Sequence, residues 1–319
     1  MTTTPDGADR PIESPDAGSQ GPHDAAIDEI AVNTATRRQV RKEQWRVLYR
    51  SPGFIIGSAI MTLWIVSSFF PELLANFDPK ISVTGPEGQT LTRMPPDSTL
   101  WFGTDRLGRD VYSRVIYGSR PIMIAAPAAT IIAAVIGTLL GLLSGYFKGW
   151  VDELVSRLLE AILSIPAILL AIVIVFTFGA TNPVIIGAIA FLFIPPIART
   201  VRAATLAESQ LDYVTAARMR GERSLFIIGR EIFPNVTGVV VVEVTVRLGY
   251  AIFTLATLAF LGLSGGDVTD PNWGVDVAQN YQQIVAQVWW PTVFPALAIG
   301  TLVIGVNLIA DSIERATKS

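Results

Sequence analysis

Six blocks of apolar residues divide the chain, and polar segments connect them. Most of the blocks contain the roughly 20 residues that an α-helix needs to cross the hydrocarbon core of a bilayer. Only a few ionisable residues fall inside the blocks. The pattern predicts an all-α integral membrane protein with six transmembrane helices, at about residues 53–75, 121–146, 158–178, 183–198, 236–263 and 289–310.

The fourth block is the weakest candidate for a span. It is short, and Pro195-Pro196 near its end is expected to disrupt the helical hydrogen bonds there. The basic residues nevertheless favour six crossings, because 17 of the 24 Lys and Arg residues then lie in cytoplasmic segments. Without the fourth span, the Arg-rich segment 199–230 would lie outside. The sequence thus predicts a multi-pass protein of the cytoplasmic membrane with both termini in the cytoplasm.

Two polar segments precede the first span. Residues 1–36 contain few large apolar side chains and many turn formers, so we expect a disordered cytoplasmic tail. Residues 37–52 interleave basic residues with Trp45 and Leu48, which predicts a juxtamembrane amphipathic segment in contact with anionic membrane lipid. Residues 53–319 form the predicted transmembrane domain, with an external loop at 76–120 and a cytoplasmic loop at 204–235.

Composition narrows the functional classes. The chain has no cysteine and one histidine, His23, so it offers no Cys/His metal site and no Ser-His or thiol nucleophile. Its basic residues are spread over several segments, which argues against nucleic acid as a partner. It has no G-x-x-x-x-G-K-[ST] phosphate-binding loop. We therefore expect a non-enzymatic chain without metal or cofactor, and any ATP and Mg²⁺ would be bound by another chain.

The cytoplasmic loop 204–235 is too polar to cross a membrane and too regular to be a linker. Good helix formers continue through Arg220, and Gly221 suits a left-handed helix cap. A second amphipathic run then leads to Pro234. The loop predicts a short helical hairpin at the membrane surface, and an ordinary pair of amphipathic surface helices would have the same appearance.

Three ionisable residues within the predicted spans are functional candidates: Glu160, Glu243 and Arg247. Glu243 and Arg247 are four residues apart with the acid nearer the N-terminus, which favours an ion pair on one helix face. Mutual neutralisation is the simpler explanation for this pair. A position along a substrate path is the alternative.

Two segments resemble one family of transport proteins. Thr215-Ala216-Ala217, Gly221 and Ile232-Phe233-Pro234 are similar in type and spacing to the "EAA" loop of ABC importer permeases. This chain departs from that pattern at Thr215, where the family has Glu, and at Phe233, where it has Leu. Residues 101–120, WFGTDRLGRDVYSRVIYGSR, resemble the signature of the dipeptide, oligopeptide and nickel branch, its C-type subunit in particular. The resemblance extends from about residue 37 to the C-terminus.

The resemblance implies the type I ABC importer permease fold and a translocation subunit for di- or oligopeptides, driven by ATP through alternating access. It implies a second permease subunit of B type, cytoplasmic ATPase subunits and an extracytoplasmic substrate-binding protein as partners. The loop would be the coupling helix that docks on the ATPase. The residues assigned to this coupling are Asp212, Tyr213, Thr215, Ala216, Ala217, Arg218, Gly221 and Pro234.

The external segment has two competing interpretations. A turn or cap near Thr104 and the interleaved charges that follow predict an amphipathic helix lying on the outer face. It could be a gate or the surface that receives the binding protein, or a structural collar between the external loop and the second span. The collar is the commoner role for charges beside a membrane. The candidate residues are Gly103, Thr104, Asp105, Gly108, Arg109, Asp110 and Arg114.

Two alternatives remain for the function. The same branch includes permeases for nickel, glutathione and other small solutes, so the substrate follows from resemblance alone. An ion-coupled secondary transporter is the alternative from a different class. Such transporters normally show acids or broken helices near the membrane midplane and often an internal repeat, and this sequence has few acids and no convincing repeat.

Overall fold

A computed structural model describes residues 48–267 and 269–318. The predicted tail at 1–36 and most of the juxtamembrane segment at 37–52 lie outside this part of the chain. Within it the fold is helical, and β structure is limited to isolated bridges such as Thr104 with Asp110. Five helices are long and apolar enough to cross a membrane, and a bent helix pair raises the count to six. The predicted all-α membrane class is confirmed.

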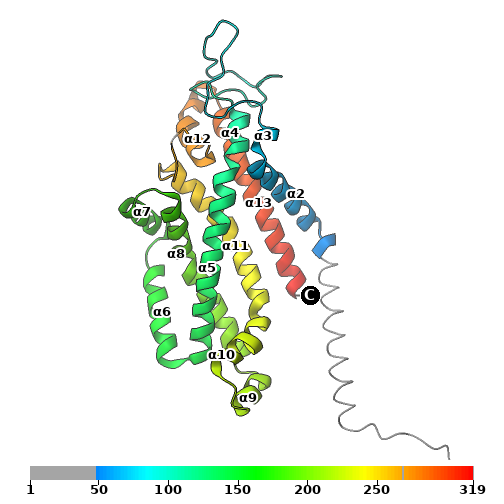
Figure 1. The fold of residues 1–319 in the computed structure, drawn as a ribbon, viewed down its shortest axis with the longest axis vertical. Helices are drawn as coiled ribbons and strands as arrows, with labels where there is room; N and C mark the ends of the chain where they lie inside the picture. The colour runs from blue at the N-terminus through cyan, green and yellow to red at the C-terminus, as the bar shows by residue number, and fades with distance from the viewer. Residues whose placement is uncertain (1–47, 268, 319) are drawn as a thin grey trace, which may run out of the picture. The chain divides into compact units, whose positions relative to one another are not determined.

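The helices follow one another with short connections, apart from the long loop between α3 and α4 (Figure 1). The elements are α2 (Pro52–Phe69), α3 (Pro71–Leu74), α4 (Val111–Tyr117), α5 (Ser119–Phe147), α6 (Gly149–Leu163), α7 (Ala167–Phe178), α8 (Asn182–Glu208), α9 (Asp212–Met219), α10 (Ser224–Phe226), a π-helical turn (Ile227–Ile232), α11 (Phe233–Phe260), α12 (Trp273–Asn280), a 3-10 turn (Tyr281–Ala286) and α13 (Trp290–Lys318).

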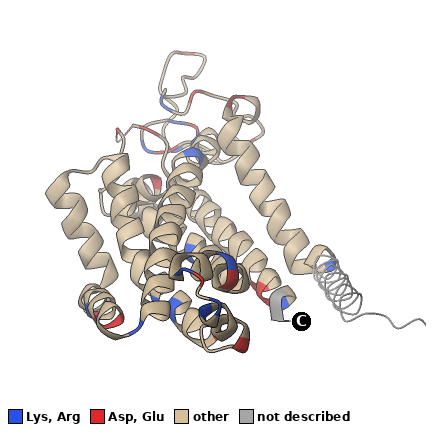
Figure 2. Ribbon diagram, turned by 60° about the horizontal axis from the view of Figure 1, so that its bottom comes forward, with Lys and Arg blue, Asp and Glu red and all other residues tan. Residues whose placement is uncertain are grey.

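Helices α5, α8 and α11 pack on one another and form the centre of the bundle. Figure 1 shows α9 and α10 at one end of these helices, and α4, α12 and the long loop at the other. We call these the α9 end and the α12 end. Blue Lys and Arg segments gather around the α9 end in Figure 2. The two candidate loops of the sequence therefore lie at opposite ends of the bundle.

Among the described helices, α5 and α8 share the most extensive contact, which runs along a stripe of small residues. Alanine or glycine occupies every fourth position along α5, and all five residues are buried: Ala129, Ala133, Gly137, Gly141 and Gly145. A Cβ atom added to Gly141 would lie 2.7 Å from the carbonyl oxygen of Ala198 and 2.7 Å from Cβ of Val201. Small residues at this spacing let two membrane helices approach until their backbones touch. We call this contact the glycine seam.

The glycine seam also explains why α8 differs from its predicted form. Pro195-Pro196 was expected to disrupt the helix, but α8 continues through both prolines to Glu208. Each proline removes one hydrogen bond from the helical ladder. In a membrane span this loss is tolerated because neighbouring helices hold the segment in place. Here α5 packs against Ile197, Ala198 and Val201, directly after the prolines.

The third predicted span, residues 158–178, is two helices in the structure. Helices α6 and α7 meet at a bend of 86° around Ser164 to Pro166. Pro166 has no N–H and biases the residue before it away from helical geometry, which accounts for the break at this point. Helix α7 packs on α8 through Ala171 and Val175, which are fully buried. The interruption thus lies one span earlier than the sequence predicts.

Candidate functional site

The α9 loop has the helix, glycine, helix order that the sequence predicts. Helix α9 ends at Met219, and Gly221 has a φ of 74°, in the left-handed region. No atom lies within 4 Å of the position of a Cβ at Gly221, so backbone conformation alone requires glycine there. The chain then turns into α10.

Pro234 does not end a helix. Helix α10, the π-helical turn and α11 form one continuous helical segment from Ser224 to Phe260, and Pro234 lies in the first turn of α11. The wider π-helical turn directly precedes the proline. π-Helical turns are rare, and together with proline they mark the places where helices bend. The second arm of the predicted hairpin is therefore the start of a membrane-spanning helix.

The two faces of α9 differ sharply. Val214 and Ala217 are fully buried against the chain's own helices. The predicted coupling residues on the exposed face are Asp212, Thr215, Ala216 and Arg218. The guanidinium of Arg218 lies 4.8 Å from the ring centroid of Tyr146, at the end of α5. Ala216 is thus available to another protein, whereas the small size of Ala217 serves packing within this chain. Of the two alanines assigned to the coupling, only Ala216 lies on the exposed face.

Tyr213 fixes the position of α9. Its hydroxyl donates a hydrogen bond of 2.6 Å to Oε1 of Glu208 and accepts one of 3.0 Å from Nδ2 of Asn235. Burial, followed by the carboxylate of Glu208, raises the pKa of Tyr213 to about 12. The hydroxyl therefore remains a donor at neutral pH. It ties the end of α8 and the start of α11 to α9.

Replacing Tyr213 with phenylalanine is expected to loosen α9 without unfolding the bundle. Each of the two lost hydrogen bonds is worth about 0.5–1.5 kcal/mol, so trypsin cleavage at Arg218 and Arg220 should be at least roughly two- to tenfold faster. Limited proteolysis of the membrane-embedded protein measures this rate. Thr215→Val is the control, because the Thr215 hydroxyl makes only a long 3.5 Å contact with its own helix. Equal cleavage of both variants would show that Tyr213 does not position α9.

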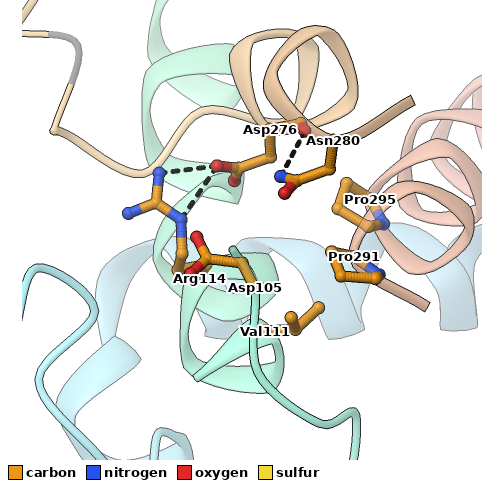
Figure 3. A pocket seen from close by; sticks show the side chains of 7 residues that line it. All are labelled: Asp105, Val111, Arg114, Asp276, Asn280, Pro291 and Pro295. Carbon is orange, nitrogen blue, oxygen red and sulfur yellow. Dashed lines mark hydrogen bonds and ion pairs between the residues drawn. The ribbon is translucent and has the colours of Figure 1, made fainter. Parts of the chain in front are cut away.

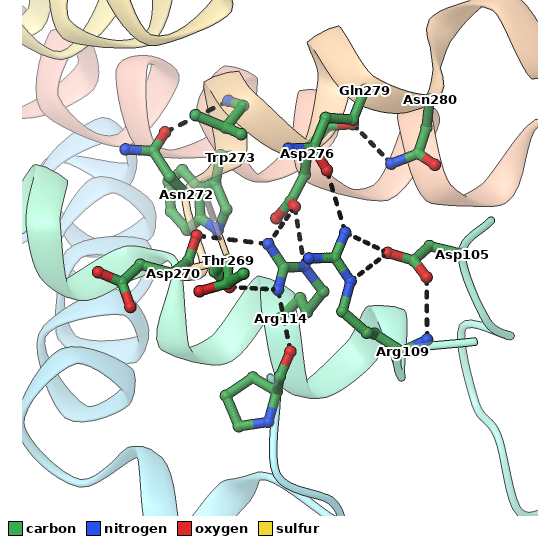
Figure 4. Close-up of polar contacts among 12 residues, drawn as sticks. Asp105, Arg109, Arg114, Thr269, Asp270, Asn272, Trp273, Asp276, Gln279 and Asn280 are labelled. Carbon is green, nitrogen blue, oxygen red and sulfur yellow. Dashed lines mark hydrogen bonds and ion pairs between the residues drawn. The ribbon is translucent and has the colours of Figure 1, made fainter. Parts of the chain in front are cut away.

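The α12 end holds a buried ion-pair cluster (Figure 4). Nε and Nη2 of Arg114 on α4 donate to Oδ1 of Asp276 on α12 at 2.8 and 2.6 Å. The same guanidinium donates to the carbonyl oxygens of Pro79 at 2.9 Å and Thr269 at 3.1 Å. Both side chains are almost completely buried. Burial raises the pKa of Asp276, and the charge of Arg114 opposes that shift.

Asp105 and Arg109 form a second buried pair beside the first. Oδ1 of Asp105 accepts from the backbone N–H groups of Leu107 and Arg109, and Oδ2 accepts from Nε of Arg109 at 2.7 Å. Nη2 of Arg109 also donates to Oε1 of Gln279 on α12 at 3.0 Å. Asp110 caps α4 by accepting from the N–H of Ser113. Burial raises the pKa of the Asp110 carboxyl.

The geometry at the α12 end favours the collar over an exposed docking surface. The seven residues proposed for a gate or binding-protein surface, Gly103, Thr104, Asp105, Gly108, Arg109, Asp110 and Arg114, are all buried within this chain. Helix α4 continues into α5 as one segment from Val111 to Phe147, and does not lie flat on the outer face as expected. The cavity beside Asp276 measures about 10 Å³ and is too small for a substrate (Figure 3).

The charged residues within the spans divide into two kinds. Glu243 and Arg247 form the predicted ion pair on α11, with Nε of Arg247 2.7 Å from Oε1 of Glu243. Glu160 lies on the exposed face of α6, where nothing in the described part of the chain covers it. On the same helix, Asp152 forms an ion pair with Arg202 of α8 and so ties α6 to the bundle.

Comparison with known proteins identifies the family. The profile of the binding-protein-dependent transport system inner membrane component family matches residues 137–319, which include α9, the π-helical turn and α11. The chain belongs to this family.

Three similar proteins align with this chain over most of its length and most of their own. The dipeptide transport system permease protein DppC of Escherichia coli is 34% identical over 283 residues, 86% of this chain and 91% of that protein. DppC of Alkalihalophilus pseudofirmus is 31% identical over 307 residues, 96% of each chain. A putative peptide transport system permease protein of Brucella suis is 34% identical over 272 residues, 84% of this chain and 88% of the relative.

The structure of this inner-membrane component also contains site residues that the sequence interpretation missed. Asp276 and Trp273 of α12 contact α4, where Nε1 of Trp273 donates to the carbonyl oxygen of Val115 at 2.7 Å. Asp276 is 162 positions from Arg114, and no local pattern links them. The burial of Val214 could have been predicted, because Val214 lies three residues before Ala217 on the same face of a short helix.

Proposed function

We propose that this chain is a translocation subunit of an ABC importer that carries di- and oligopeptides across the cytoplasmic membrane. The observation that carries the proposal is the alignment of this chain, over 84–96% of its length, with permeases named for peptide or dipeptide transport. The family profile supports the inner-membrane role independently of the substrate. Nickel, glutathione and other small solutes are the substrates to be tested against peptides.

The chain acts with other proteins in this proposal. A second, B-type permease subunit completes the path, an extracytoplasmic binding protein delivers the substrate, and cytoplasmic ATPase subunits bind ATP and Mg²⁺. No step on this chain makes or breaks a covalent bond. Its work is a change between two arrangements that open to opposite sides of the membrane.

The exposed face of α9 is the proposed contact with the ATPase. Ala216, Thr215 and Asp212 project from the α9 end, and Met219 is 79% exposed. Leu225 of α10 is a second apolar side chain that is 73% exposed at this end. Exposed apolar side chains gathered in one region are typical of a contact surface. The gathering of Lys and Arg at the same end supports placing the α9 end in the cytoplasm (Figure 2). We propose that both termini also lie in the cytoplasm, as the distribution of basic residues along the sequence favours.

Ala216→Glu tests the contact. It adds bulk and charge to an exposed position, so the fold is expected to survive while co-purification with the ATPase and ATP-dependent uptake of labelled di- to pentapeptides fall at least about tenfold. Ala180→Glu is the matched control, because Ala180 is an exposed alanine between α7 and α8 and far along α8 from α9.

Three outcomes would contradict parts of this proposal. Normal ATPase binding and uptake with Ala216→Glu would remove α9 from the contact. Uptake driven by a proton gradient without ATP would indicate a secondary transporter. Failure of the wild-type complex with every peptide, together with uptake of a metal chelate, would replace the proposed substrate.

A further inference from the structure

One face of α11 carries a stripe of polar side chains that other described residues leave at least partly uncovered. Its members recur at intervals of four and three residues, which places them on one side of the helix. The opposite side is buried at Gly249, Ile252 and Ala256. We call this set the polar stripe: Glu243, Arg247, Tyr250, Thr254 and Thr257. It extends about 21 Å along the helix axis.

The uncovered face of α5 has a different composition. On α5 the exposed residues along the middle of the helix are all aliphatic, as suits contact with lipid tails: Ile131, Ile132, Val135, Ile136 and Leu139. Ionisable residues within membrane spans instead face the interior of an assembly or a water-filled cavity. The polar stripe is therefore a poor match for lipid tails.

The ion pair in the polar stripe has unused hydrogen-bonding capacity. Nε and Nη2 of Arg247 both contact the same carboxylate atom, Oε1 of Glu243, at 2.7 and 2.5 Å. Among the described residues, Oε2 of Glu243 and Nη1 of Arg247 make no hydrogen bond. The two side chains are 14% and 22% exposed, and the guanidinium lies 5.5 Å from the ring centroid of Tyr250. One carboxylate oxygen and one guanidinium nitrogen of this pair thus have no hydrogen-bond partner among the described residues.

A cavity adjoins the polar stripe on its side toward the α12 end. It measures about 320 Å³ and lies between α7, α8 and α11, with Thr254, Thr257, Phe193 and Phe253 in its wall. The hydroxyl groups of Thr254 and Thr257 donate to carbonyl oxygens of their own helix, so their lone pairs remain free to accept. This volume and this mixture of apolar and polar groups are typical of a site for a small ligand.

We propose that the polar stripe lines the substrate path, and that Glu243 and Arg247 bind the ammonium and carboxylate ends of a zwitterionic peptide. The inference rests on the proposed import of peptides. A zwitterion can exchange partners with the ion pair, Glu243 taking the ammonium group and Arg247 the carboxylate, so no buried charge is left unpaired during passage. A neutral or singly charged solute cannot make this exchange.

Cysteine labelling tests the path without measuring transport. The chain has no cysteine, so Thr254→Cys and Val135→Cys each introduce one reactive site into this subunit. In the assembled transporter, a membrane-impermeant thiosulfonate is expected to modify Thr254→Cys at least about tenfold faster than Val135→Cys, since only a thiol in contact with water ionises readily. Saturating Ala-Ala, with the binding protein present, should slow the reaction. Equal rates at the two positions would overturn the inference.

A neutral double variant tests the ion pair. Glu243→Gln with Arg247→Met leaves no unpaired charge in the membrane and should still assemble. Uptake of radiolabelled Ala-Ala is expected to fall at least about tenfold, while ATP hydrolysis stimulated by the binding protein stays within about twofold of wild type. The matched control is Glu153→Gln with Arg157→Met, which removes an ion pair of the same spacing from the exposed surface of α6. Its uptake should equal that of the wild type.

The outcomes separate this inference from the proposed function. Wild-type uptake of Ala-Ala together with unchanged uptake by the Glu243→Gln, Arg247→Met variant would overturn the role of the ion pair. Absence of peptide uptake by the wild-type complex would instead refute the peptide substrate. In that case the labelling rates at Thr254→Cys and Val135→Cys still decide whether the polar stripe lines a water-filled path.

Discussion

Replacing Arg114 with methionine is expected to cause a large loss of stability. The change leaves Asp276 buried with an uncompensated charge, which costs about 3–5 kcal/mol in comparable buried pairs. Two backbone carbonyls, those of Pro79 and Thr269, also lose a donor. The midpoint of thermal unfolding in detergent, at a fixed scan rate, should fall by roughly 6–20 °C for a domain of this size.

Two comparisons make this expectation specific. Asp276→Leu in the Arg114→Met background removes the stranded carboxylate and should recover much of the lost stability. Lys80→Met breaks an exposed ion pair with Asp270 at the same end of the bundle, and should leave the unfolding midpoint almost unchanged. If Arg114→Met and Lys80→Met behaved alike, the buried cluster would not hold the α12 end together.

Replacing Gly141 with leucine should prevent normal folding of the bundle. The new Cβ would lie 2.7 Å from the carbonyl oxygen of Ala198, and a backbone atom cannot move aside as a flexible side chain can. Helices α5 and α8 would have to separate along the glycine seam. Overpacking alone costs about 1–3 kcal/mol, and lost contacts along the seam add to this. Little monodisperse protein should be recovered from the membrane fraction.

Gly300→Leu is the control for the glycine seam. Gly300 is also a glycine within a long membrane helix, α13, but no atom lies within 4 Å of the position of its Cβ. Its replacement should leave the recovery of monodisperse protein, measured by size-exclusion chromatography, close to wild type. Gly141→Ala should give an intermediate result. Equal recovery of all three variants would contradict the close approach of α5 and α8.

Hydrophobicity was sufficient to predict the fold class, but it did not locate the break in the helices. The sequence contains helix-disrupting proline signals at Pro166 and at Pro195-Pro196, and local propensity ranks the double proline as the stronger. The structure breaks at Pro166 and continues through Pro195-Pro196. The difference lies in packing, because α8 is held by the glycine seam immediately after its prolines. Whether a helix continues through a proline therefore depends on packing against residues that are distant in sequence.

The same distinction between local and distant contacts applies to the candidate sites. The Glu243–Arg247 pair was predictable because its two residues are one helical turn apart. The partner of Arg114 was not, since Asp276 comes from a separate loop and helix, and the sequence alone left Arg114 as a charge at the membrane surface. The difference between Ala216 and Ala217 depends on the rotation of α9, which the buried Val214 fixes.

The Arg114–Asp276 pair also has a consequence for biogenesis. The two residues are 162 positions apart, so ribosomes that add about 5–20 residues per second make Arg114 roughly 8–30 s before Asp276. During that interval α4 and α5 exist without α12, and the guanidinium of Arg114 lacks the carboxylate of Asp276. Completion of the α12 end is therefore a late event in synthesis, and the nascent chain must keep Arg114 in contact with water until α12 emerges.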